Sequence, residues 1–94
     1  MTDRQFFRHY KSQDQESIAG CYEVLGTVVD HETEQVGTVY RPCYCSMQDG
    51  SMGYWRPWEQ FNECFGKVPR FARITDPELI KRCIAATDLL YGEG

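Results

Sequence analysis

Short segments rich in Val, Ile and Tyr alternate with turn residues along the first three quarters of this 94-residue chain. Such segments are typical of β-strands, and the polar residues between them favour hairpin connections. This pattern predicts four strands, at residues 18–30, 36–46, 54–57 and 67–74. Pro69 places the last of them on an edge of the sheet. Four or five short strands imply a small, strongly bent sheet, so we expect an SH3-like sheet or barrel over about residues 8–74.

The C-terminal segment predicts one α-helix at residues 76–91. Thr75 and Glu78 have the spacing of a capping box, and Gly92 ends the helix. One broad face of this helix carries Leu79, Ile80, Cys83, Ile84, Ala86, Thr87, Leu90 and Tyr91. Because a small barrel offers limited area to bury that face, we expect a homo-oligomer, most simply a dimer, assembled in part through the helix. The alternative is that the helix covers its own sheet. The fold class is then mainly β (α+β), with residues 1–94 as one domain.

Charge and cysteine content exclude several classes of protein. The net charge is −4, whereas a protein that binds duplex DNA usually has a basic surface. No apolar run is long enough to span a membrane, and the first 17 residues do not have the apolar core of a signal peptide. We therefore expect a cytoplasmic protein whose five cysteines are reduced thiols, and their odd number argues against a complete disulfide framework.

Residues 39–61, VYRPCYCSMQDGSMGYWRPWEQF, combine many aromatic rings with Arg41 and Arg56. A guanidinium stacks on rings and binds phosphate or carboxylate through two hydrogen bonds, and neighbouring rings can hold a planar base. Near the N-terminus, His9 and its neighbours form a second group of possible donors. The candidate ligand-binding residues are His9, Tyr10, Lys11, Tyr40, Arg41, Tyr54, Trp55 and Arg56. In the alternative interpretation the rings fill the core, and the arginines pair with Glu23, Glu32 or Asp49.

The sequence has no recognisable catalytic or metal-binding arrangement. No familiar catalytic signature surrounds any cysteine or histidine, so we predict that the protein is not an enzyme and has no catalytic residue. Cys43 and Cys45 have a spacing that could begin a zinc site, but no second paired motif supplies the other ligands. We accordingly predict no metal and no cofactor.

Six blocks of sequence resemble a small prokaryotic family catalogued as domain of unknown function 1653. They are HYK (9–11), CYEVLG (21–26), HETE (31–34), VYR (39–41), RPWEQF (56–61) and VPRF (68–71). The resemblance covers about residues 8–71 and implies a small barrel with no assigned chemistry. Family members run almost directly from the first block into a strand, whereas residues 12–19 form a longer loop here. The helix after Thr75 also lies outside the family blocks.

A further departure from the family pattern affects the aromatic stretch. The pattern has a tryptophan two residues before the Arg-Pro pair, where this chain has Tyr54, and Trp55 is one residue further along. In a strand, that shift of one residue turns the indole to the opposite face.

Two functions fit these observations. The first is non-catalytic binding of a small anionic, nucleotide-like ligand, by a protein that acts as a sensor or as a sequestering sponge. Its rings would stack on the ligand, while Lys11, Arg41 and Arg56 hold the charges. Short phage proteins that sequester nucleotide signals of bacterial defence are comparable in size and site chemistry, so an anti-defence role fits this hypothesis. The alternative is an SH3-like module whose rings grip an extended, basic peptide.

Overall fold

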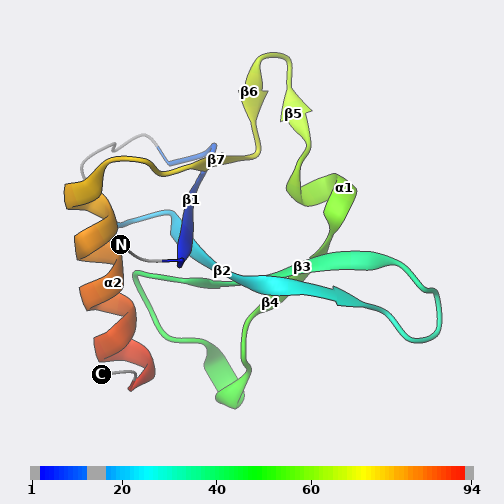
Figure 1. The fold of residues 1–94 in the computed structure, drawn as a ribbon, viewed down its shortest axis with the longest axis horizontal. Helices are drawn as coiled ribbons and strands as arrows, with labels where there is room; N and C mark the ends of the chain where they lie inside the picture. The colour runs from blue at the N-terminus through cyan, green and yellow to red at the C-terminus, as the bar shows by residue number, and fades with distance from the viewer. Residues whose placement is uncertain (1–2, 13–16, 93–94) are drawn as a thin grey trace.

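The computed structural model describes residues 3–12 and 17–92. The elements, in chain order, are β1 (Gln5–His9), β2 (Cys21–Val29), β3 (Val36–Pro42), the 3-10 turn η1 (Gln48–Gly50), β4 (Tyr54–Pro57), α1 (Trp58–Phe61), β5 (Cys64–Phe65), β6 (Val68–Pro69), β7 (Phe71–Arg73) and α2 (Pro77–Tyr91). Five strands form one antiparallel sheet in the order β4-β3-β2-β1-β7, and β5 and β6 form a separate small hairpin (Figure 1). The prediction of a mainly β fold with a C-terminal helix is confirmed.

Three strands differ from the sequence prediction. Strand β1 was not predicted, although it lies between β2 and β7 in the sheet. The predicted strand at residues 67–74 is divided, because the backbone N–H of Arg70 turns away to donate to the carbonyl of Glu63 at 2.7 Å. Val68–Pro69 therefore pairs with β5, whereas Phe71–Arg73 pairs with β1. The predicted strand at 36–46 ends at Pro42, four residues early.

The five-stranded sheet is covered on both faces. On one face, Phe6, Cys21 and Cys43 pack against α2 through Leu79 and Cys83. On the other face the core is aromatic, and it is made by Tyr40, Phe61 and Phe71, with Phe7, Tyr22 and Val24 packed against them. Figure 1 shows α2 on one side of the strands, with α1 and the β5–β6 hairpin on the other. The alternation of side chains along each strand keeps these two sets apart.

Helix α2 begins with a different cap from the one predicted. The side chain of Asp76, not Thr75, accepts a hydrogen bond from the backbone N–H of Glu78 at 3.1 Å, so the capping-box assignment was wrong. The helix ends as expected at Gly92, which adopts a left-handed conformation with φ 71°. No helix in the described part of the chain is long and apolar enough to cross a membrane.

The apolar face of α2 packs on the chain's own sheet. Leu79, Cys83 and Thr87 are buried there. By contrast, the side chain of Leu89 is 85% exposed and that of Leu90 is 37% exposed. A homo-oligomer assembled through this helix stays a prediction, and its interface would have to use these two leucines rather than the buried face.

Candidate ligand-binding site

A pocket of about 240 Å³ opens on the aromatic face of the sheet. We call it the aromatic pocket; it is lined by His9, Tyr22, Tyr40, Tyr54, Arg56 and Phe71. Each of the five strands of the sheet contributes to it. Tyr40 lies opposite Tyr54 across β3 and β4, and His9 lies opposite Phe71 across β1 and β7. The strand register therefore brings together residues that are up to 62 positions apart in the chain.

Arg56 supplies the positive charge of the aromatic pocket. Its Nε donates to the Tyr40 hydroxyl at 3.2 Å, and its guanidinium carbon lies 5.9 Å from the centre of the Phe71 ring. Arg4, Arg41 and Arg70 each form an ion pair with a carboxylate. Among the residues that the structure describes, Arg56 has no such pair, so its charge is not neutralised by a neighbouring side chain.

His9 lies in the same pocket, and its surroundings favour the neutral imidazole. Burial lowers the pKa of His9 below its ordinary value of 6.5, and the positive charges of Arg70, Arg56 and Lys11 lower it further. The imidazole is therefore neutral at pH 7. Its Nδ1 accepts a hydrogen bond from the backbone N–H of Lys11 at 3.2 Å, which leaves the proton on Nε2. Neutral His9 can donate from Nε2 to an anion.

Tyr22 adds a second neutral donor. Its hydroxyl shares a hydrogen bond of 2.8 Å with the hydroxyl of Tyr44. Burial raises the pKa of Tyr22 well above its ordinary value, and the hydrogen bond with Tyr44 raises it further. The phenol consequently stays protonated and does not repel a negatively charged ligand.

Tyr10 and Lys11 lie beside the aromatic pocket rather than in its lining. The ring of Tyr10 lies 4.7 Å from the ring of His9. Lys11 lines a neighbouring hollow of about 430 Å³, to which His9 and Tyr22 also belong. The two hollows therefore share His9 and Tyr22 in their linings.

Arg41 lies on the opposite face of the sheet, under α2. Its side chain is 8% exposed, and its Nε and Nη2 both donate to one oxygen of Glu23, at 3.0 and 2.9 Å. The guanidinium also lies 4.1 Å from the centre of the Tyr91 ring. Glu23 is shared with Arg4, whose Nε donates to its second oxygen at 2.7 Å. Arg41 thus has the carboxylate partner that the alternative interpretation of the sequence named.

Trp55 is also separated from the aromatic pocket. Its indole covers Gly37, where an added Cβ would come within 1.9 Å of the indole nitrogen. Tyr54 and Arg56, on either side of it, line the pocket. Trp55 was predicted as a ligand-binding residue, but the structure places it outside the aromatic pocket, on the face opposite to Tyr54 and Arg56. Of the eight candidate residues, the structure brings together His9, Tyr40, Tyr54 and Arg56 in one pocket.

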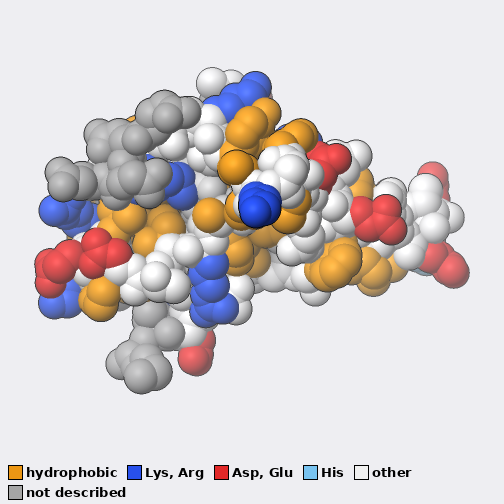
Figure 2. Space-filling model, turned by 90° about the horizontal axis from the view of Figure 1, so that it is seen from above, with side chains coloured by type: hydrophobic (Ala, Val, Ile, Leu, Met, Phe, Trp, Pro, Cys, Tyr) orange, Lys and Arg blue, Asp and Glu red, His pale blue; other side chains and the backbone are white. Residues whose placement is uncertain are grey.

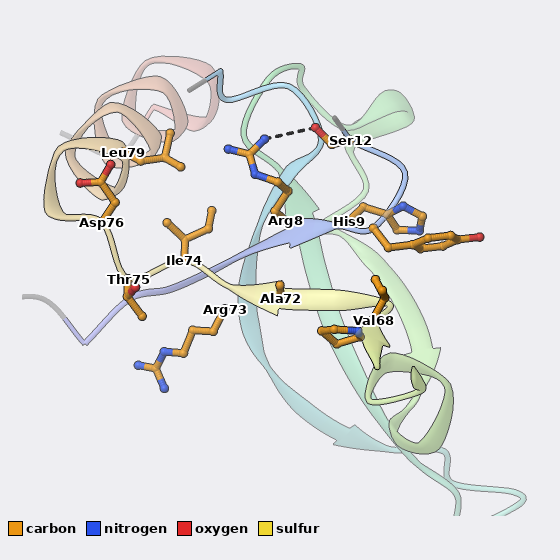
Figure 3. Close-up of a pocket in the computed structure, with 12 residues that line it drawn as sticks. Arg8, His9, Ser12, Val68, Ala72, Arg73, Ile74, Thr75, Asp76 and Leu79 are labelled. Atoms are coloured by element: carbon orange, nitrogen blue, oxygen red, sulfur yellow. Dashed lines mark hydrogen bonds between the residues drawn. The ribbon is translucent and has the colours of Figure 1, made fainter. Parts of the chain in front are cut away.

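A larger hollow of about 460 Å³ lies between β1, β7 and the start of α2 (Figure 3). Two arginines line it, Arg73 and Arg8. The guanidinium of Arg8 donates to Ser12 Oγ at 3.1 Å and to the backbone carbonyls of Ser17 and Ala19. Arg73 extends away from Arg8 in this view, and Asp76 brings a negative charge. Asp76 thus places a carboxylate in the lining of this hollow, whereas the lining of the aromatic pocket contains none.

Sequence reasoning missed Tyr22 and Phe71 as pocket residues. Both belong to blocks that carry the family resemblance, CYEVLG and VPRF, and this was the available signal. Their place in the pocket depends on strand register. Tyr22 lies opposite Phe7, and Phe71 lies opposite His9 on the other side of β1, the strand that was not predicted.

The fold and pocket define a small, mainly β protein with an arginine-containing aromatic pocket. The family model described as "Protein of unknown function (DUF1653)" matches residues 5–73, and the chain belongs to this family. The expected resemblance is therefore confirmed, and the match includes the whole five-stranded sheet but not α2. No curated protein and no solved structure matches the chain.

Proposed function

We propose that this chain is a non-catalytic, cytoplasmic binding protein for a small anionic ligand of the nucleotide type, which it senses or sequesters. The observation that carries the proposal is Arg56, an arginine with no carboxylate partner among the described residues, placed among rings. Aromatic faces stack on a planar group, while a guanidinium and neutral donors hold phosphate or carboxylate oxygens. The pocket thus offers both kinds of contact that a nucleotide requires.

The volume of the aromatic pocket limits which part of a nucleotide it can hold. A volume of about 240 Å³ suits a single ring or a phosphate group better than a whole nucleotide. The neighbouring hollow with Lys11 shares His9 and Tyr22 with the lining of the aromatic pocket. We propose that a bound ligand occupies both hollows, with one part against Arg56 and the other toward Lys11.

The first test is a thermal-shift screen against mono-, di- and cyclic nucleotides, followed by calorimetry on the compounds that raise the melting temperature. We expect Arg56→Ala to weaken binding about ten- to a hundredfold, because a hydrogen bond to a charged group contributes about 1.5–3 kcal/mol.

The matched control for this test is Lys81→Ala, which removes one positive charge from an exposed position on α2. It should bind like the parent protein. If no nucleotide raises the melting temperature, or if Arg56→Ala and Lys81→Ala bind equally well, the proposed function is wrong.

A further inference from the structure

The end of the β2–β3 hairpin extends beyond the body of the molecule (Figure 1). Apolar side chains are exposed on it. Val29 and Val36 are paired across the two strands and are 61% and 45% exposed. Trp58, at the start of α1, is 52% exposed. Val36, Trp58, Gln35 and Glu59 line a groove of about 360 Å³, which we call the hairpin groove. It shares no lining residue with the aromatic pocket.

The hairpin turn next to the hairpin groove is acidic. The hairpin turn carries Asp30, Glu32 and Glu34, and residues 28–37 contain no lysine or arginine. Glu59 adds a fourth carboxylate inside the groove itself. Figure 2 shows acidic side chains at the end of the molecule where the hairpin lies, next to hydrophobic ones. An apolar groove with an acidic border complements a partner that is apolar and basic.

The turn that carries these carboxylates is held by its own hydrogen bonds. Asp30 Oδ1 accepts from the backbone N–H of Glu32 at 2.9 Å, and the Asp30 carbonyl accepts from that of Glu34 at 2.7 Å. Glu34 adopts a left-handed conformation with φ 59°, where Gly or Asn fits with less strain. Glu34 is thus a charged residue at a backbone position that Gly or Asn would occupy with less strain. We take this as support for a role of its carboxylate in binding.

We propose that the hairpin groove binds a basic peptide segment of a partner protein. An apolar side chain of the peptide packs on Val36 and Trp58, and a lysine or arginine beside it reaches Glu59 and Glu34. A second copy of this chain is a poor occupant, because it would bring two acidic hairpin turns together. A nucleic acid is repelled for the same reason. Trp58 has the exposure and size of a residue that dominates a peptide interface.

The test is selection of binders from a displayed library of random 12-residue peptides, using the purified full chain. Peptides that also bind Trp58→Ala are removed. We expect the surviving sequences to combine lysine or arginine with large apolar residues and to bind Trp58→Ala at least about tenfold more weakly. The control is Trp55→Ala, which removes the same ring from the opposite face of the sheet and should bind like the parent. No enrichment over Trp58→Ala, or enrichment of peptides without basic residues, overturns the proposal.

Two variants of Glu34 distinguish the effect of its charge from the effect of its backbone conformation. Glu34→Gln removes the carboxylate and keeps the strained conformation, so we expect about two- to fivefold weaker peptide binding with the melting temperature unchanged. Glu34→Asn also relieves the strain, so binding should weaken while the melting temperature rises. If both variants bind the selected peptides like the parent, the acidic turn does not recognise the peptide and the proposal is wrong. Nucleotide binding at the aromatic pocket should be unaffected in both, so this result is independent of the function proposed above.

Discussion

Arg41 and Arg56 occupy similar positions in the sequence but have different surroundings in the fold. Both follow a tyrosine or tryptophan within a strand. Arg41 is buried under α2 and shares Glu23 with Arg4, whereas Arg56 is half-buried at a pocket and hydrogen-bonds to a tyrosine hydroxyl. Because removal of one partner leaves a buried charge poorly compensated, the two arginines should differ in their contribution to stability.

We expect Arg41→Ala to lower the free energy of unfolding by about 3 kcal/mol, since Glu23 then keeps only Arg4 as a partner. Arg56→Ala should lower it by about 1 kcal/mol or less, the contribution of one hydrogen bond between a charged and a neutral side chain at a partly exposed site. Urea unfolding of both variants measures the difference. Equal losses would contradict the assignment of Arg41 to the ion pair.

His9 gives the protein a pH-dependent stability. Its pKa in the folded state lies below the ordinary value of 6.5, so between these two values the unfolded chain binds more protons than the folded chain. Stability must therefore fall as the pH drops through about 6.5 and stop falling below the folded pKa. His9→Gln should make the unfolding free energy less dependent on pH between pH 7.5 and 5. Parallel pH profiles for the parent and His9→Gln would refute this explanation.

Local chemistry indicated four of the six residues that line the aromatic pocket, and strand pairing decided the other two. The association of arginine with rings identified Tyr40, Tyr54 and Arg56 without any knowledge of the fold. The same reasoning also selected Arg41, because the identity of a residue does not show which face of a strand it occupies or where its carboxylate partner lies. Glu23 comes from another strand, 18 residues away, and only the register of β2 with β3 brings it opposite Arg41.

At the scale of single elements, β1 shows why an important strand can escape prediction. The segment QFFRH has adjacent phenylalanines, and Phe6 faces α2 while Phe7 faces the aromatic core. A strand covered on both faces does not show the alternation of polar and apolar residues that marks a half-exposed strand. Its partner β7 comes about 60 residues later, so no local turn signals the pairing.

The start of α2 depends on a single capping side chain. Asp76 is the N-cap residue, and its side chain accepts a hydrogen bond from the backbone N–H of Glu78. We expect Asp76→Ala to lower the free energy of unfolding by about 1 kcal/mol, the usual contribution of an N-cap. Thr75→Ala is the control and should change it by less than about 0.5 kcal/mol. Thermal unfolding followed by circular dichroism at 222 nm compares the two, and a larger loss for Thr75→Ala would restore the capping-box assignment.

At the scale of the whole molecule, the two faces of the sheet carry two separate cores. The face under α2 holds the cluster of Phe6, Cys21 and Cys83, with the ion pairs of Glu23 nearby. The opposite face holds the aromatic pocket, and the hairpin groove lies at the end of the molecule. Substitutions in the pocket or the groove can thus change binding without disturbing the packing of α2. This separation allows both proposed sites to be tested in a folded protein.

The family match ends at residue 73, yet α2 covers one face of the matched sheet. In a chain that ends at Ile74, Phe6, Cys21 and Cys43 would lose the cover of Leu79 and Cys83, and the hydrogen bond from the Tyr91 hydroxyl to the Pro42 carbonyl, 2.7 Å long, would be absent. Burial of each large apolar side chain contributes about 1.5–3 kcal/mol, and a domain of this size has a total stability of about 5–15 kcal/mol.

We therefore expect the chain ending at Ile74 to show no cooperative thermal unfolding, whereas full-length Lys81→Ala, altered at an exposed position on α2, unfolds like the parent. Differential scanning calorimetry provides the measurement. A cooperative transition in the truncated chain near that of the intact protein would show that the sheet is stable without α2. In that case the helix, rather than covering the sheet for stability, would be free to serve the predicted contact between chains.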